Sequence, residues 1–347
     1  MSSLSSTLRR LLTVALAAVG VVVFKLADLP LPFLFGPMCG CLLAALAGAP
    51  LKGLGEVSTA FRTILGVAIG ASITPEVVGR LPQMALSVAL IPIYIAVIGC
   101  VGVPFFRKVF GFDWATSWYA AMPGGLQDMV IFGTEAGGDM RALSLIHATR
   151  VLIIVSLAPL IMTHGFGVSL SNPIGAPASD IPLKELGLMA LAAIVGWKGG
   201  ERIGLFGASI LGPMIVTAVL SLSGLIHSRP PAESIVAAQF FIGMSIGVGY
   251  VGVTLQELRR VVSAGVLFVV LLAALAAVFT ELVVHLELAH PVEGFLAFAP
   301  GGQAEMTVLS IIAGADLGFV IVHHLTRVLI VITGAPIAAR LMRRDGE

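Results

Sequence analysis

Residues 123–159, PGGLQDMVIFGTEAGGDMRALSLIHATRVLIIVSLAP, align without gaps on residues 300–336, PGGQAEMTVLSIIAGADLGFVIVHHLTRVLIVITGAP, at an offset of 177 positions. Identical residues fall on Pro-Gly-Gly, a Gly-x-Asp triplet, a histidine and the run Thr-Arg-Val-Leu-Ile. Upstream, a Gly-Pro-Met triplet and a Gly-x-x-x-Gly pattern recur at nearly the same offset. A self-similarity of this length predicts a duplicated structural unit. We therefore divide the chain into repeats 1–172 and 173–347.

The composition identifies an integral membrane protein. Of 347 residues, 58% are hydrophobic and only 11% are charged, and the mean hydropathy is +1.04. Because a helix of about 20 apolar residues crosses a bilayer, we expect an all-α fold of about ten spans. The net charge of +1, without a basic tract, excludes nucleic acid as a partner.

Each repeat contains six apolar runs, and the fifth is interrupted. These runs are 9–28, 31–50, 57–75, 81–106, 113–137 and 140–164, then 184–198, 204–222, 234–253, 261–286, 292–314 and 317–341. Pro-Gly-Gly cuts the fifth run near its middle in both repeats, and such a break is tolerated at membrane depth only where protein or a water-filled cavity surrounds it. The interrupted run could cross the membrane or re-enter and turn back.

The distribution of basic residues favours re-entry. If the fifth run crosses, the loop lysines and arginines divide ten inside to seven outside; if it re-enters, they divide thirteen to four. Only the second division obeys the positive-inside rule clearly. We therefore predict two inverted repeats of five transmembrane helices, each with a Pro-Gly-Gly-tipped re-entrant hairpin before its last helix. Both termini would be cytoplasmic, in a bacterial inner membrane.

Three arginines fall within predicted spans: Arg62, Arg150 and Arg327. An arginine there needs a cavity or a partner. Arg150 and Arg327 are equivalent in the two repeats, so an in-plane pseudo-two-fold axis would bring both near the midplane. Two converging guanidinium groups indicate an anion site. Alternatively, each arginine pairs with an acid, Asp128 or Glu305, or binds carbonyls at the broken end of a hairpin.

Other matched residues would lie beside the same cavity. His147 and His324 precede the arginines by three positions and so share their helix face; they would relay protons or contact substrate, or only pack. Thr149 and Thr326 would bind a ligand or bond the carbonyl four residues back. Asp128 and Glu305 are candidate proton or cation sites, or partners of the arginines. The tip residues expected to line the substrate site are Pro123, Gly124, Gly125, Pro300, Gly301 and Gly302.

Two further matched motifs are expected to be structural. Asp139 and Asp316 would cap the helices that follow them. The Gly-x-x-x-Gly patterns, residues 66–70 and 243–247, would allow close helix packing.

The paired P-G-G-x-x-[DE]-M, G-x-D and H-x-T-R-V-L-I motifs, with G-P-M upstream, resemble the AbrB-type duplicated membrane proteins. Some members carry the label ammonia monooxygenase. The arrangement of five spans with a glycine-tipped hairpin before the last is also similar to secondary transporters of the citrate and glutamate type, although a fold does not determine a substrate.

From these residues we expect a secondary active transporter of a small organic anion, a carboxylate or sulfonate, coupled to H+ or Na+. The chain has no P-loop, and its seven histidines show no metal-ligand spacing, so we expect no enzyme activity, cofactor or metal. A metal-dependent membrane monooxygenase and a channel or regulatory membrane subunit are the alternatives. The expected partners are the lipid bilayer and a second copy of the chain.

Overall fold

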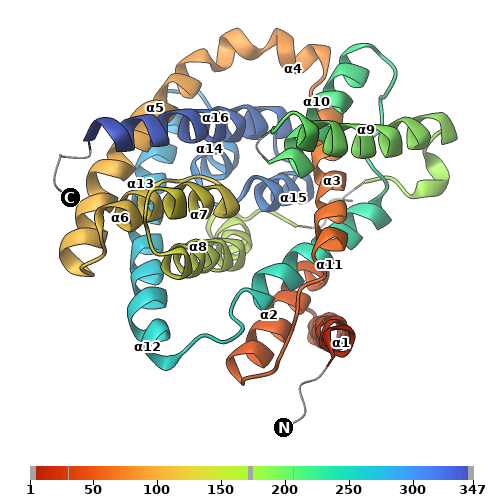
Figure 1. Cartoon of the computed structure of the whole chain (residues 1–347). Helices are drawn as coiled ribbons and strands as arrows, with labels where there is room; N and C mark the ends of the chain where they lie inside the picture. Colours follow the sequence, from red (N-terminus) through yellow and green to blue (C-terminus); the bar gives the residue numbers. More distant parts are fainter. Residues whose placement is uncertain (1–4, 30, 171–174, 206, 343–347) are drawn as a thin grey trace. The chain divides into compact units, whose positions relative to one another are not determined.

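The computed structural model describes residues 5–29, 31–170, 175–205 and 207–342, and every regular element among them is a helix (Figure 1). The proposed boundary between the repeats, at residues 172 and 173, lies outside the described residues. Within the described part the chain forms two compact units. Unit 1 comprises residues 1–79, 170–253 and 311–313, and unit 2 comprises residues 80–169, 254–310 and 314–347.

Unit 1 is built from the first helices of both sequence repeats. Its elements are α1 (Ser6–Leu26), α2 (Pro32–Leu46), α3 (Glu56–Ala71), the short α4 (Pro75–Gly79), a 3-10 turn (Ala178–Asp180), α9 (Leu183–Arg202), α10 (Ala208–Leu222) and α11 (Ala232–Val248). Helix α1 packs on α2 and α9 packs on α10, while α3 packs on α10 and α11 packs on α2. Equivalent helices of the two repeats thus make equivalent contacts.

Unit 2 contains the remaining helices of both repeats, including the two interrupted ones. Its elements are α5 (Leu81–Pro104), α6 (Trp114–Ala121), α7 (Leu126–Glu135), α8 (Met140–Leu160), α12 (Leu255–Glu257), α13 (Ser263–His285), α14 (Pro291–Phe298), α15 (Gln303–Ala313) and α16 (Leu317–Met342); π-helical turns Phe105–Val109, Ile161–Gly165 and Leu258–Val262 join or extend them. The last three residues of α15 are grouped with unit 1. Each compact unit therefore combines both sequence repeats.

The helices agree with the twelve apolar runs, and the two Pro-Gly-Gly segments separate α6 from α7 and α14 from α15 as expected. Among the described residues, five helical segments are by length and composition apolar enough to cross a membrane: Ser6–Leu26, Leu81–Val109, Met140–Gly165, Leu255–His285 and Leu317–Ala339. Helices α2, α10 and α11 are apolar but shorter than the roughly 20 residues that a span needs. The all-α membrane class is confirmed, while the number of crossings and the re-entry of the hairpins stay predictions.

Glycines set the helix spacing in unit 1. A Cβ on Gly196 of α9 would overlap the backbone of Gly212 on α10, and a Cβ on Gly20 of α1 would overlap the carbonyl of Gly36 on α2. In the Gly-x-x-x-Gly patterns, the first glycines, Gly66 and Gly243, meet the carbonyls of Ile210 and Leu34. These backbones touch because no side chain separates them, which confirms the predicted packing role.

Two aspartates cap long helices of unit 2, as predicted. The Asp139 carboxylate accepts hydrogen bonds from the amides of Arg141 (2.9 Å) and Ala142 (3.1 Å), and that of Asp316 accepts one from Phe319 (3.1 Å). These bonds satisfy amides that have no partner in the first turns of α8 and α16.

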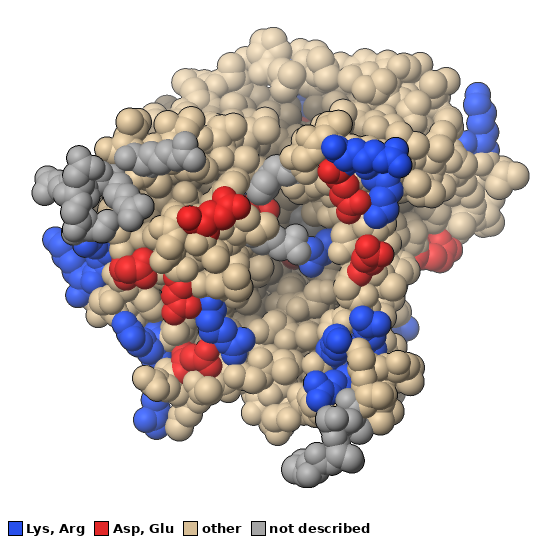
Figure 2. All heavy atoms as spheres, viewed as in Figure 1, with Lys and Arg blue, Asp and Glu red and all other residues tan. Residues whose placement is uncertain are grey.

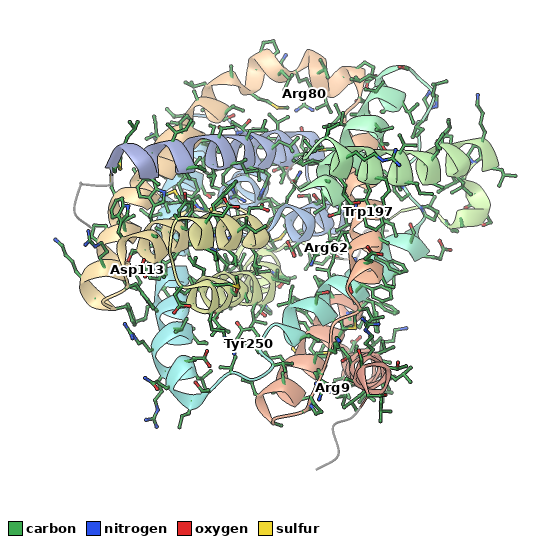
Figure 3. All side chains as sticks on the ribbon, viewed as in Figure 1. Arg9, Arg62, Arg80, Asp113, Trp197 and Tyr250 are labelled. Carbon is green, nitrogen blue, oxygen red and sulfur yellow. The ribbon has the colours of Figure 1, made fainter. Side chains whose placement is uncertain are left out.

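Two ion pairs join the repeats within unit 2, and they place opposite charges at two equivalent positions. Arg80, labelled in Figure 3 at the beginning of α5, donates to Asp316 at 2.6 Å, and Arg141 donates to Glu257 at 2.8 Å. Positions 80 and 257 are equivalent at the repeat offset of 177. Arg80, before α5 of the first repeat, bonds the residue that caps α16, the last helix of the second repeat. Glu257, before α13 of the second repeat, bonds a residue of α8, the last helix of the first repeat.

The glycine contacts predict different effects for two glycines of α9. Gly196→Ala should destabilise the protein because its Cβ would overlap the backbone of α10, whereas Gly199 has no atom within 4 Å of its ideal Cβ position. Gly199→Ala should be neutral or stabilising by up to about 1 kcal/mol, the difference in helix propensity. Thermal unfolding in detergent measures both; equal effects would contradict the packing role.

Candidate functional site

The Pro-Gly-Gly segments leave helix carbonyls without their usual donors. In a regular helix the amide of residue 123 would donate to the carbonyl of Tyr119, and that of residue 300 to Leu296, but proline has no N–H. Met122 and Ala299 have extended ψ values of 130° and 132°, so α6 and α14 end one residue earlier, at Ala121 and Phe298. Several carbonyls therefore need donors from elsewhere, because both segments are buried.

The matched histidines supply the donors that the prolines lack. His147 Nε2 lies 3.0 Å from the carbonyl oxygen of Tyr119, and His324 Nε2 lies 2.8 Å from that of Leu296. Both imidazoles are buried. Since a carbonyl only accepts, Nε2 carries the hydrogen in both rings. The histidines are thus positioned to replace the missing helix hydrogen bonds.

The matched arginines bind the next carbonyls of each break. Arg150 donates from Nη1 to Met122 O (3.2 Å) and from Nη2 to Gly124 O (2.6 Å). In the second repeat Arg327 donates to Ala299 O (2.8 Å) and Gly301 O (2.9 Å) in the same way. Both side chains are only 2% exposed. The arginines therefore bind carbonyls at the broken ends of the hairpins, which is one of the alternatives expected from the sequence. A role in binding substrate stays a prediction.

The remaining motif residues fill the space around the tips. A Cβ on Gly124 would lie 2.9 Å from Met129 Sδ, and one on Gly301 would lie 3.0 Å from Met306 Sδ. At the following glycines, Gly125 and Gly302, a Cβ would overlap the carboxylate oxygens of Asp128 and Glu305 respectively. The pattern P-G-G-x-x-[DE]-M thus describes a turn in which methionine and acid side chains cover two glycines.

The two threonines differ in their surroundings. Thr149 is buried, and a Cβ on Gly265 of α13 would lie 3.0 Å from its Cβ. Thr326 is only partly buried. Position 88, the equivalent of Gly265, is a valine, so this packing is not repeated in the second half.

The two breaks meet in one charged cluster within unit 2. Arg150 interacts electrostatically with Arg327, Glu305 and Tyr94, and Tyr94 also interacts with Arg327. The buried Tyr94 hydroxyl donates to Phe298 O at 2.8 Å. We call these four residues the arginine cluster. Arg150 and Arg327 therefore lie within electrostatic reach of each other in unit 2, and their role as a shared anion site stays a prediction.

The two tip acids are not equivalent. Glu305 is 9% exposed and acts electrostatically on Arg150, whereas Asp128 is half-buried. Tyr94 was not expected from the sequence, because position 271, its equivalent at the repeat offset, is a leucine. A search for matched residues cannot find a functional residue that only one repeat contains.

The cluster retains unused hydrogen-bonding atoms. Arg150 Nε, Arg327 Nε and His147 Nδ1 are buried and have no partner among the described residues, whereas His324 Nδ1 accepts from Arg327 Nη2 at 2.8 Å. Across the described ranges, no three His, Cys, Asp or Glu side chains form a group that could hold a metal ion.

The geometry defines a duplicated helical membrane protein with a polar site between two helix breaks. The model of the family described as "Transition state regulatory protein AbrB" matches residues 33–343, and the chain belongs to this family. The chain is 25% identical to "Uncharacterized protein YhjN" of Bacillus subtilis (strain 168), over 96% of this chain and 93% of that protein. It is also 25% identical to "Putative regulator AbrB" of Escherichia coli (strain K12), over 92% of each.

The role of the histidines can be tested through the prolines. His147→Leu should leave the Tyr119 carbonyl without a donor and cost about 1–3 kcal/mol of stability. Pro123→Ala restores an amide that can donate to this carbonyl, so His147→Leu should cost less in that background. Unfolding in detergent of the four variants of this cycle measures the coupling. His164→Leu, at an exposed position, is the control; additive costs would contradict the assignment.

Proposed function

We propose that this protein is a secondary active transporter of a small organic anion, a carboxylate or sulfonate, coupled to protons. The observation that carries the proposal is the arginine cluster, in which Arg150 and Arg327 from the two repeats interact while both are buried. Buried charges of one sign are costly unless opposite charge is nearby. A pair of guanidinium groups, held in place by the carbonyls of two helix breaks, is suited to an anion.

The unused donors support an anion at this place. The Nε–H groups of both arginines are buried without an acceptor among the described residues, and each such group costs about 1–3 kcal/mol. An oxygen of a carboxylate or sulfonate would recover this cost. The Nη groups would meanwhile keep the hairpin carbonyls bound.

Charge balance explains why the anion would bring a proton. The two arginines carry two positive charges, and in the proposed cycle the two tip acids, Asp128 and Glu305, would balance them when both are ionised. Binding an anion would leave one excess negative charge, and protonation of one carboxylate would restore neutrality. Glu305 is the stronger candidate because it is more buried and acts on Arg150.

The histidines are less suited to carry the proton. Each already uses Nε2–H to bond a carbonyl, and Nδ1 of His324 accepts a hydrogen bond from Arg327. Protonating His324 at Nδ1 would replace that bond by a contact between two donors.

The transport cycle that we propose uses the inverted arrangement. The thirteen-to-four distribution of basic residues supports two inverted repeats with re-entrant hairpins. In such a fold the site lies between the hairpin tips near the midplane and becomes accessible from each side in turn. The duplicated breaks, which place backbone polar groups inside an apolar protein, support this interpretation.

Topology is tested by cysteine labelling. In a variant without Cys39, Cys41 and Cys100, Ser179→Cys should react with an impermeant thiol reagent from the non-cytoplasmic side of intact cells. Gln256→Cys should react only after the membrane is opened. Both side chains are exposed. The opposite result would require six spans per repeat and parallel repeats.

Transport is tested in liposomes with labelled acetate, lactate, succinate and ethanesulfonate as probes. We expect an imposed pH gradient to drive uptake of at least one probe by the unmodified protein. Glu305→Gln should abolish uphill uptake while counterflow persists, because the proton site is lost and the arginines remain. Asp128→Asn should have a smaller effect, and Glu135→Gln, at an exposed position on α7, should have none.

Other results would contradict the proposal. Accumulation driven only by a sodium gradient would exclude proton coupling. The absence of saturable exchange for every probe would favour a channel or a regulatory membrane subunit; the Escherichia coli relative is named "Putative regulator AbrB". Stoichiometric iron or copper in the purified protein would favour the monooxygenase alternative.

A further inference from the structure

Basic side chains gather where α5 ends and α13 begins in unit 2. Figure 2 shows blue side chains, with red ones among them, around the part of unit 2 where α12 and the beginning of α6 lie in Figure 1. Contacts join these segments: Arg260 donates to Phe110 O at 3.1 Å, and Arg141 donates to Glu257 at 2.8 Å. The basic residues in these segments and at the start of α8 are Arg107, Lys108, Arg141, Arg259 and Arg260.

Three acids beside these groups already have partners. Asp113, labelled in Figure 3 at the start of α6, accepts from the amide of Thr116 at 2.8 Å, and Asp139 caps α8. Glu257 pairs with Arg141 and accepts from the amide of Thr254 at 2.8 Å. The guanidinium group of Arg259 is exposed and forms no hydrogen bond or ion pair with a described residue. Positive charge therefore remains available at this surface.

A surface hollow of about 610 Å³ lies at these arginines. It is lined by Phe110, Leu255, Gln256, Arg259 and Arg260. Arg260 is fixed there by its bond to Phe110 O and by its position 5.1 Å from the centre of the Phe112 ring. Leu255 is 63% exposed, so a large apolar side chain adjoins the two guanidinium groups. The hollow thus combines two cationic groups with an apolar wall.

The aromatic residues indicate the depth of this hollow in a bilayer. Phe110, Phe112 and Trp114 follow the long apolar helix α5, and Arg107 lies 5.7 Å from the Trp114 ring. Aromatic side chains beside arginines at the end of a span are typical of the level of the lipid headgroups. A ligand there would meet phosphate groups on one side and acyl chains on the other.

We propose that this hollow binds the headgroup of an anionic phospholipid, with its phosphate on Arg259 and Arg260 and the beginning of its acyl chains on Leu255 and Phe110. Arginines bind phosphate oxygens with paired N–H groups, and basic clusters at the cytoplasmic ends of spans attract anionic lipids. The excess of basic residues that predicts a cytoplasmic location for this end supports the same partner.

The test compares two lipids with identical acyl chains. Phosphatidylglycerol, added to delipidated protein in detergent, should raise the unfolding temperature by roughly 3 °C more than phosphatidylcholine does. Inorganic phosphate and glycerol phosphate should not reproduce this shift. Arg259→Gln should remove the difference between the lipids. Arg202→Gln, at an exposed position at the end of α9, should retain it.

Three results would overturn the proposal. Equal shifts with both lipids would indicate a general lipid effect. A full phosphatidylglycerol shift in Arg259→Gln would place the lipid elsewhere, and a shift with phosphate alone would indicate a soluble anion. Arg259 is the residue to change, since its guanidinium group forms no bond to a described residue, whereas the guanidinium group of Arg260 donates to Phe110 O. Retained lipid can also be counted by native mass spectrometry, where Arg259→Gln should carry less phosphatidylglycerol.

Discussion

Proline without an amide hydrogen, in the middle of an apolar helix, is the constraint on which the rest of this structure depends. Pro123 and Pro300 each remove one donor and force the chain out of the helix, which leaves carbonyls that lipid cannot satisfy. A histidine and an arginine one turn apart on the last helix of each repeat, α8 or α16, bond three carbonyls of each break. Pro-Gly-Gly and H-x-T-R are therefore parts of one structural motif that the sequence contains twice.

The same motif would give the proposed anion site its positive charge. A guanidinium group that holds two carbonyls cannot leave the break without a large cost, so its charge is fixed in place. Two such groups in one unit create a positive centre, which in the proposed transport cycle a bound anion and a transferred proton would compensate in turn. The buried Glu305 is placed to respond to both. In the proposed transporter, the same side chains would bond the carbonyls of the breaks and bind the anion, so the two effects must be separated by experiment.

Much of the fold could be predicted from the sequence because its signals are periodic and repeated. Apolar runs predict the helices, and Asp139 and Asp316 predict where two of them begin, because an aspartate there can cap the first turn. The division into two units could not be predicted, because it depends on long-range packing between repeats. Tyr94 was missed because only one repeat contains it. The difference between Asp128 and Glu305 was missed because burial depends on neighbours that the sequence does not reveal.

The two ion pairs have a consequence for the history of the chain. Arg80 and Glu257 occupy equivalent positions with opposite charge, and each bonds the last helix of the other repeat. Two identical half-length chains would present the same charge at both positions, so the present pairing requires that the halves diverged in a coordinated way. In a pair of two second repeats Glu257 would meet Asp316, which has the same charge, whereas in a pair of two first repeats Arg80 would meet Asp139, the equivalent of Asp316, as well as Arg141. In this contact the second repeat is therefore complementary in charge to the first repeat and no longer to a copy of itself.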